Sequence, residues 1–263
     1  MNYKTMNLRK YGNAPYKIAV VHGGPGAAGE MAPVARELST ITGVLEPLQT
    51  ATTLKGQAEE LISVLKENGD LPVTLIGYSW GAFLSYIVAA QHQPVVRKLI
   101  LVSCGPFEEE YAESIKRTRL SRLNEQDRKE VGELAEKMKD PQIPDKNRIF
   151  ARWGELLTKG DGYDTLPHGS EIVEFRYDIN QKVWEQAVAL RRSGKLLELG
   201  NKIKCPVVAI HGDYDSHPAA GANEPLSRVI KDFRFILLQN CGHTPWLEKQ
   251  ARDKFFRILE GEI

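Results

Sequence analysis

The stretch Val73-Thr74-Leu75-Ile76-Gly77-Tyr78-Ser79-Trp80-Gly81 carries an apolar run into a serine that has a glycine two residues away on each side. Residues 73–76 have the composition of a buried strand, and residues 80–91 have that of a buried helix. A strand that turns sharply into a helix strains the central residue, and larger side chains at the flanking positions would collide. The stretch therefore predicts a strand, a tight turn and a helix, with the hydroxyl of Ser79 raised clear of the sheet.

The segment from 71 to 90 contains no charged residue, and its length alone would fit a membrane-spanning helix. Pro72, Gly77 and Gly81 place turn signals inside this segment, however. We therefore interpret it as two buried elements of a globular fold.

Short apolar runs recur along the chain and alternate with helical patterns. Apolar positions between 54 and 65 are spaced as one face of a helix, which Asn68-Gly69 ends. Thr244-Pro245 has the sequence of an N-cap followed by a first-turn proline, and predicts the start of the closing helix. Strands that are apolar on both faces and separated by helices form a parallel sheet covered by helices. The predicted strands are residues 18–21, 43–45, 73–76, 98–102, 206–210 and 233–238.

The charge density and the hydrophobic pattern of the chain change between residues 107 and 200. There 36 of 94 residues are charged, against 33 of 169 in the rest, and the patterns are helical without a strand-like apolar run. We predict a helical cap over 107–200, inserted into a core that is formed by 1–106 and 201–263.

Composition excludes several classes of protein. The 263 residues suit one large domain or one domain with an insertion, and 42% hydrophobic residues supply a sizeable core. Because 35 Lys+Arg balance 34 Asp+Glu, no field steers the protein to nucleic acid or to an anionic membrane. The three cysteines lack metal-ligand or disulfide spacing, and residues 1–6 show no apolar signal-peptide region. We expect a cytoplasmic protein without a metal or cofactor.

The motif at 77–81 fits G-x-S-x-G in the strand–turn–helix context that this motif requires. A serine hydroxyl needs a base to act as a nucleophile at neutral pH. Among six histidines we choose His243, because it lies between the last predicted strand and the closing helix, where a loop reaches the strand ends. His22 and His211 end strands and are expected to hold neighbouring loops, and His92 and His168 lack supporting context.

The imidazole in turn needs a carboxylate that fixes its tautomer and stabilises the imidazolium. Asp213 and Asp215 share the loop after the strand at 206–210. We prefer Asp215, which is farther past the strand end, and keep Asp213 as the alternative that braces the turn. The resulting chain order Ser…Asp…His is typical of one serine-hydrolase architecture.

Acyl transfer also needs N–H donors for the developing oxyanion. The N–H of Trp80, at the start of the predicted helix, is one donor. The second comes from His22-Gly23-Gly24-Pro25-Gly26 after an earlier strand, where we assign Gly24 and keep Gly23 as the alternative. A phosphate-cradling role is disfavoured, because neither G-x-G-x-x-G nor a Walker lysine is present.

These motifs together resemble the α/β-hydrolase superfamily. The combination of His22-Gly23-Gly24-Pro25-Gly26 with Gly77-Tyr78-Ser79-Trp80-Gly81 is most similar to the prolyl iminopeptidase group, whose members remove an N-terminal residue from peptides. The resemblance covers about 15–105 and 204–261 and is weak in the cap. It implies an α/β-hydrolase fold, no cofactor, and a small-molecule or short-peptide substrate.

In that group, cap glutamates hold the free amino terminus of the substrate. Arg152-Trp153-Gly154-Glu155 and Val173-Glu174-Phe175-Arg176-Tyr177 are similar to the two glutamate segments of the group, which assigns Trp153, Glu155 and Glu174 to substrate binding. The alternative is that both glutamates are solvated helix-face residues. The chain also departs from the group: Glu46-Pro47-Leu48-Gln49-Thr50 replaces its Asp-Gln-Arg-Gly-like turn, and the short leader leaves little room for the first strands.

The sequence thus predicts a serine hydrolase that forms an acyl-enzyme, with an aminopeptidase as the first hypothesis. A carboxylesterase, a lactonase or another acyl hydrolase is the second. A ligand-binding protein without catalysis and a lyase or cofactor-free oxygenase on the same scaffold remain as alternatives, because a fold does not fix the chemistry.

Overall fold

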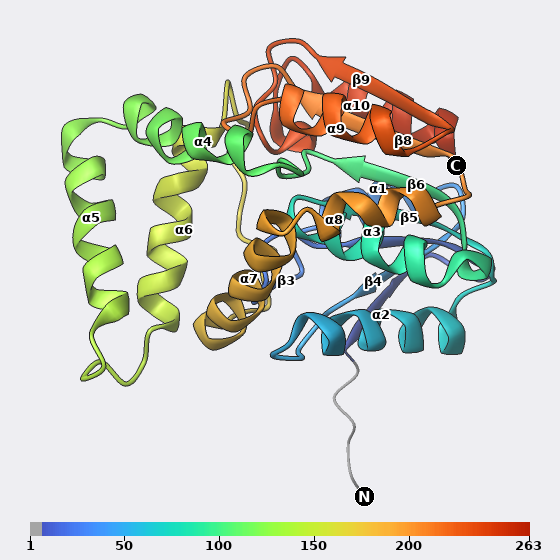
Figure 1. Ribbon diagram of the computed structural model, residues 1–263, viewed down its shortest axis with the longest axis horizontal. Coiled ribbons are helices and arrows are strands. Elements are labelled where there is room, and N and C mark those ends of the chain that lie inside the picture. Colours follow the sequence, from blue (N-terminus) through green and yellow to red (C-terminus); the bar gives the residue numbers. More distant parts are fainter. Residues whose placement is uncertain (1–6) are drawn as a thin grey trace, which may run out of the picture.

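A seven-stranded sheet forms the centre of the protein in this computed structural model, which describes residues 7–263 (Figure 1). Residues 1–6, where no signal peptide is expected, lie outside the described residues. The strand order is β1-β4-β2-β5-β6-β8-β9, and every pair is parallel except β1 with β4. The strands are β1 Leu8–Tyr11, β2 Tyr16–Val21, β4 Gly43–Pro47, β5 Val73–Tyr78, β6 Val96–Val102, β8 Val207–Gly212 and β9 Phe233–Leu238.

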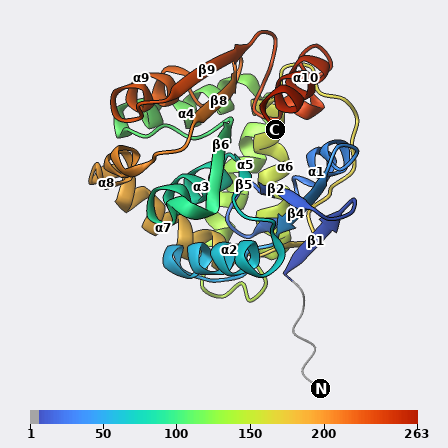
Figure 2. The same ribbon diagram turned by 90° about the vertical axis from the view of Figure 1, so that its right-hand side faces the viewer.

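Helices cover both faces of the sheet, so the predicted fold class is confirmed (Figure 2). On one face, α2 (Leu54–Asn68), α3 (Trp80–Gln91) and α9 (Ala220–Val229) bury apolar side chains against the strands. On the other face, α1 (Ala32–Leu38) and α10 (Arg252–Glu262) do the same. The central strands are therefore dry on both sides, as their nearly continuous apolar composition requires.

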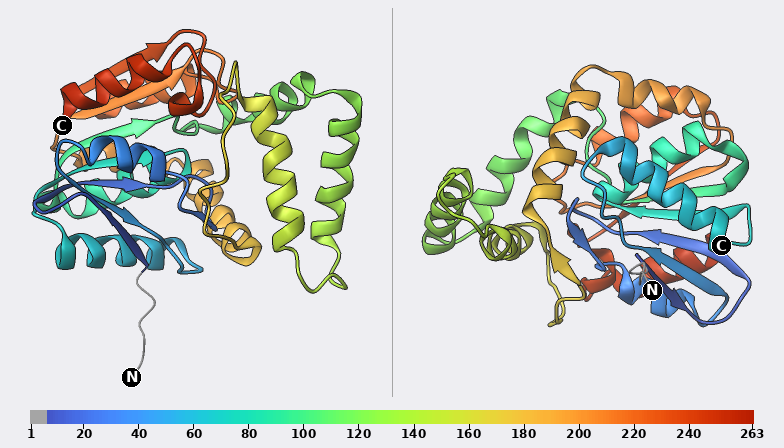
Figure 3. Two further views of the ribbon diagram at one scale, coloured as in Figure 1. Left: turned by 180° about the vertical axis from the view of Figure 1, so that it is seen from behind. Right: turned by 90° about the horizontal axis from the view of Figure 1, so that it is seen from below.

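The segment between β6 and β8 is helical and lies mainly at one end of the sheet (Figures 1 and 3). Its helices are α4 (Glu109–Arg122), α5 (Glu125–Lys139), α6 (Asn147–Asp161), α7 (Tyr177–Arg192) and α8 (Lys195–Glu198). α4, α5 and α6 share a small apolar cluster of their own. Within this segment the strand β7 (Glu174–Phe175) was not expected; it pairs antiparallel with β3 (Ala27–Ala28) of the glycine-rich loop. The division into a core and a cap at 107–200 stays a prediction.

The prediction for the closing helix is wrong. A short 3₁₀ turn follows Thr244, and α10 begins only at Arg252. The hydroxyl of Thr244 hydrogen-bonds the hydroxyl of Tyr78 at 3.2 Å instead of capping a helix. The buried carboxylate of Glu248 accepts the N–H of Gly242 at 2.9 Å and two further N–H groups from the segment after α6. These tertiary bonds hold the chain in a turn.

The uncharged segment 71–90 forms β5 and the greater part of α3, as predicted. Over residues 7–263, no helix combines the length and the apolar character that a bilayer crossing requires.

Candidate active site

Ser79 occupies the turn between β5 and α3. Its backbone has φ +50° and ψ −113°, a conformation that a residue with a Cβ rarely adopts. The residues on either side, Tyr78 and Trp80, are buried, whereas Ser79 is partly exposed. The turn therefore presents the serine hydroxyl at the carboxyl end of the strands, where it is open to a substrate.

The two flanking glycines are required by backbone crowding. A Cβ on Gly77 would lie 2.3 Å from the carbonyl oxygen of Gly81, and a Cβ on Gly81 would lie 2.3 Å from that of Val21. Both distances are far below van der Waals contact, so neither position accepts a side chain. The second contact also places the end of β2 against the serine turn.

His243 lies in the loop after β9, with its imidazole beside Ser79. The hydroxyl of Ser79 donates to Nε2 of His243 across 3.1 Å. The backbone N–H of His243 donates to the carbonyl of Asp161 at 3.0 Å, and its ring packs 5.1 Å from the ring of Tyr78. The histidine is thus held by its backbone as well as by its side chain.

Asp215 contacts the other nitrogen of this imidazole. Nδ1–H of His243 donates to Oδ2 of Asp215 at 2.7 Å, and the carboxylate is fully buried. Asp213 accepts the backbone N–H of Cys241 at 3.1 Å and so braces the loop. The structure therefore brings Ser79, His243 and Asp215 into one hydrogen-bonded row and leaves Asp213 outside it.

The charges around His243 favour its protonated form. Burial lowers its pKa, but the neighbouring carboxylates of Asp215 and Asp161 outweigh burial, and the pKa of His243 is raised above its ordinary value. Burial raises the pKa of Asp215, yet the histidines that face it hold that pKa well below the usual range. The carboxylate thus stays ionised and can stabilise an imidazolium.

The sequence predicts the backbone N–H groups of Trp80 and Gly24 as the oxyanion donors. Trp80 is the first residue of α3, and an N–H at this position has no partner within the helix. Gly24 lies in the loop after β2 with φ +37°. Gly23, the alternative donor, lies close to Glu30, since a Cβ on Gly23 would be 2.7 Å from Oε2 of Glu30. The assignment of Gly24, with Gly23 as the alternative, stays a prediction.

Sequence reasoning did not find Glu30. A Cβ on Gly23 would lie 2.7 Å from Oε2 of Glu30 and 2.7 Å from the Tyr78 ring, so the carboxylate lies against this tyrosine. Burial raises the pKa of Glu30 to about 7, although His243 and the Gly23 backbone both oppose the shift. Among residues 7–263, no cationic side chain forms an ion pair with it. A lone glutamate in a Gly/Ala loop carries no sequence signal that would reveal this environment.

The three cap residues that the family resemblance suggested lie in different surroundings. The side chain of Glu155 is 62% exposed and pairs with Arg152 at 3.2 Å. Glu174 is 63% exposed and lies 4.0 Å from Arg176, in the short strand beside the glycine-rich loop. Trp153 packs against the apolar cluster of α4, α5 and α6, and its buried indole N–H has no partner among the described residues. The structure does not gather these residues into one acidic cluster.

One group of side chains has the composition of a metal site. Ligand atoms of Asp215, His217 and His243 all lie within 4.8 Å of one another. Nδ1 of each imidazole, however, is hydrogen-bonded to the aspartate, at 2.9 and 2.7 Å. These are the distances of direct hydrogen bonds, so a proton shared between each imidazole and the carboxylate accounts for the arrangement better than a metal ion does.

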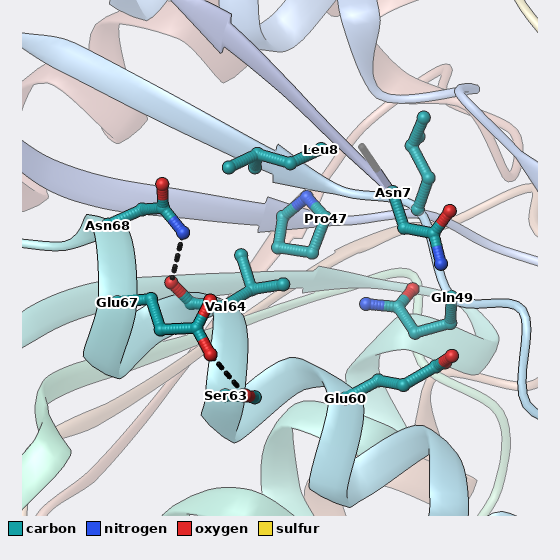
Figure 4. Close-up of a pocket in the computed structure, with 10 residues that line it drawn as sticks. Asn7, Leu8, Pro47, Gln49, Glu60, Ser63, Val64, Glu67 and Asn68 are labelled. Atoms are coloured by element: carbon teal, nitrogen blue, oxygen red, sulfur yellow. Dashed lines mark hydrogen bonds between the residues drawn. The ribbon is translucent and has the colours of Figure 1, made fainter. Parts of the chain in front are cut away.

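A separate pocket of about 310 Å³ lies between α2 and the β1–β4 edge (Figure 4). None of the candidate site residues lines it. Two of its polar groups are already paired: Ser63 donates to Glu67 at 2.8 Å, and Asn68 donates to the carbonyl of Val64 at 3.1 Å.

The sequence and the fold were compared with those of known proteins. Residues 50–250 match the family model described as alpha/beta hydrolase fold. A search of curated proteins finds no match. Among solved structures, VinJ is 18% identical with a TM-score of 0.67 over 97% of this chain and 93% of that chain. A proline iminopeptidase from Mycobacterium smegmatis is 17% identical with a TM-score of 0.63 over 97% and 93%. A putative lipase from Acinetobacter baumannii AYE is 20% identical with a TM-score of 0.64 over 97% and 87%.

Identities this low indicate a shared fold and leave the activity open. The family model covers most of the chain, and it agrees with the resemblance inferred from the two glycine-rich motifs. The chain therefore belongs to the α/β-hydrolase fold family.

Proposed function

We propose that this protein is a cofactor-independent serine hydrolase that works through a covalent acyl-enzyme. The observation that supports the proposal is the continuous row of hydrogen bonds from the strained Ser79 through His243 to the buried Asp215, at 3.1 and 2.7 Å. A serine activated by a base, which is in turn oriented by a carboxylate, is the arrangement that nucleophilic acyl transfer requires.

In the first half of the reaction, Oγ of Ser79 attacks the substrate carbonyl carbon while Nε2 of His243 takes the hydroxyl proton. The N–H groups of Trp80 and Gly24 stabilise the negative charge that develops on the carbonyl oxygen. When the tetrahedral intermediate collapses, the bond to the leaving group breaks and His243 gives its proton to that group. Asp215 stays ionised throughout and stabilises the imidazolium.

In the second half, a water molecule takes the place of the leaving group. Nε2 of His243 removes a proton from the water as its oxygen bonds to the acyl carbon. The bond between that carbon and Oγ of Ser79 then breaks, and the proton returns to the serine. The products are a carboxylic acid and the free enzyme.

For the substrate we favour an aminoacyl compound with a small or proline-like N-terminal residue. Its free ammonium would need an anionic partner on entering a partly dry site. Glu155 and Glu174 already face arginines in solvent, whereas Glu30 forms no ion pair with a lysine or arginine among the described residues, and only the charge of His243 acts on it. We infer that Glu30 receives the ammonium group, with Glu155 and Glu174 as the anchors that the family resemblance implies.

An ester or lactone is the second candidate substrate. The observation that favours it is that the acidic side chains suggested by the resemblance are exposed and charge-balanced by Arg152 and Arg176. A neutral acyl group needs no anionic anchor, and the same serine, base and oxyanion donors would serve it.

The expected result of adding a fluorophosphonate probe to the folded protein is one covalent adduct on Ser79. The strained turn and the neighbouring His243 make this hydroxyl reactive, whereas ordinary serines do not react. Intact-mass spectrometry and peptide mapping give the stoichiometry and the site. A folded protein that remains unlabelled would favour the ligand-binding alternative.

If Glu30 binds the ammonium group of the substrate, its replacement should lower activity on aminoacyl arylamides and leave activity on esters nearly unchanged. Glu30→Gln keeps the size of the side chain but removes the carboxylate that can pair with an ammonium, so kcat/KM for a prolyl or alanyl arylamide should fall about 10- to 100-fold. Hydrolysis of a p-nitrophenyl ester should change by less than about threefold, since an ester has no ammonium to lose. Steady-state kinetics on both substrates measure the split.

Glu155→Gln and Glu174→Gln are the matched variants, because they make the same change at the two exposed positions. A loss confined to arylamides in either would identify that residue as an anchor. An equal loss on arylamide and ester in Glu30→Gln would contradict its role and point to damage of the glycine-rich loop.

A further inference from the structure

Besides His243, two histidines contact the carboxylate of Asp215: His217, and His211, whose Nε2 lies 3.3 Å from Oδ2 of this carboxylate. Oδ1 of Asp215 accepts the backbone N–H of His217 at 2.9 Å and lies 2.9 Å from Nδ1 of the same residue. Its Oδ2 is the atom that faces His243. Because the carboxylate is fully buried, these partners fix its rotation.

Arg119 determines the tautomer of His217. Nη2 of Arg119 lies 3.4 Å from Nε2 of His217, and a guanidinium group can only donate. Nε2 must therefore carry the lone pair, so the proton is on Nδ1 and is donated to Asp215. Burial, together with the positive charge of Arg119 and the proximity of His243, lowers the pKa of His217 to about 4 despite the opposing carboxylate. His217 is thus neutral at pH 7 and does not compete with His243 for the charge of Asp215.

Asp161 holds Arg119 in place and closes the arrangement into a ring. Nε of Arg119 lies 2.7 and 2.9 Å from the two carboxylate oxygens of Asp161. The carbonyl of Asp161 accepts the backbone N–H of His243 at 3.0 Å. The rings of His217 and His243 stack with centroids 4.4 Å apart and planes 25° apart. Every member of the ring therefore has at least two contacts within it.

The ring joins segments that are distant in the sequence. Arg119 belongs to α4 and Asp161 is the last residue of α6, whereas Asp215 and His217 follow β8. Figure 1 shows α4 and α6 beside the end of the sheet where β8 and β9 also end. One turn farther along α4, Arg122 donates to the carbonyl of Tyr214 at 2.7 Å. Helices of the insertion are thus fastened to the loop that carries the acid.

We propose that His217, held by Arg119, is a positioning residue that fixes Asp215 for its bond to His243, so that the row Ser79–His243–Asp215 is complete only while α4 and α6 are seated on the core. The proposal rests on the proposed function for its kinetic consequence. Its geometric content, the tautomer of His217 and its bond to Asp215, does not depend on any activity.

The kinetic test compares His217→Asn with His217→Leu. The amide nitrogen of asparagine can take the place of Nδ1–H, so this variant should keep kcat within about threefold. Leucine fills similar space but donates nothing, so kcat on a p-nitrophenyl ester should fall about 10- to 100-fold with little change in KM. His168→Asn and His168→Leu provide the same pair of changes at an exposed histidine and should leave kcat unchanged. Equal kcat in the two His217 variants, whether high or low, would overturn the proposal.

The second measurement is an NMR titration of the histidine ring nitrogens in the wild-type protein. We expect His217, assigned by comparison with His217→Asn, to show a protonated Nδ1 and an unprotonated Nε2 from pH 5 to pH 8. A protonated Nε2, or titration to the doubly protonated form within this range, would overturn the proposal even if His217→Leu failed to fold. Wild-type protein that shows the expected tautomer, hydrolyses neither esters nor aminoacyl arylamides and is not labelled by a fluorophosphonate would leave the positioning intact and refute the proposed function instead.

Discussion

Replacing Ser79 by alanine should lower kcat/KM for an activated ester at least about 10⁴-fold, because no other group can form the acyl-enzyme once the hydroxyl is gone. The fold should persist. Alanine keeps the Cβ that makes φ +50° unfavourable, so the strain of the turn is the same before and after the change. The midpoint of thermal unfolding should therefore move little while p-nitrophenyl ester hydrolysis disappears.

Ser103 provides a matched control for this experiment. It is also a serine with positive φ, +45°, at the end of the neighbouring strand β6. Its buried hydroxyl has no hydrogen-bond partner among the described residues, so Ser103→Ala should retain wild-type turnover. Ester hydrolysis by purified Ser79→Ala above about 1% of wild type would refute the mechanism, since general-base catalysis by His243 alone does not supply that rate.

The parts of the fold that could be predicted are those that local sequence determines. β5, the serine turn and α3 follow from an apolar run, two small flanking residues and an uncharged helix, and the backbone crowding at Gly77 and Gly81 explains why the motif is so specific. α2 ends at Asn68 with Gly69 after it, as expected from the terminating pair. In each case the residues that form the sequence pattern lie within a few positions of the element that they predict.

Elements that depend on distant partners could not be predicted in this way. The edge strand β1 was not expected, because its sequence Leu-Arg-Lys-Tyr is mostly polar. Tertiary contacts hold β1 in the sheet. Tyr11 donates to the buried carboxylate of Glu46 at 2.7 Å, and Arg9 lies 3.4 Å from the same carboxylate. This pairing also explains how β4 tolerates a glutamate in a fully buried strand.

The same limit applies to the site. The G-x-S-x-G motif selected Ser79, and loop position selected His243 and Asp215, because parallel strands bring their carboxyl ends to one edge. Glu30, Arg119 and Asp161 were missed, since their importance comes from burial and from contacts with residues that are up to two hundred positions away. A charged residue in a helical or glycine-rich segment looks like a solvated one until packing removes the water around it.

Replacing Asp215 by asparagine should lower kcat about 10⁴-fold with little change in KM, because the variant favours the wrong tautomer of His243. The backbone N–H and Nδ1–H of His217 both point at Oδ1, so the amide oxygen of asparagine should face His217. The amide NH₂ then faces His243 and donates to its Nδ1. A proton on Nε2 cannot be avoided in that arrangement, and Nε2 loses the lone pair that accepts the proton of Ser79.

Asp213→Asn is the matched control, since it makes the same change two residues away in the same loop. Asp213 accepts one N–H, that of Cys241 at 3.1 Å, and an amide oxygen can accept it equally well. Its kcat should therefore stay within about threefold of wild type, because a neutral acceptor replaces a charged one on a bond that only braces the loop. A larger loss in Asp213→Asn than in Asp215→Asn would show that the carboxylate we assign to His243 in the resting structure is not the one that acts during turnover.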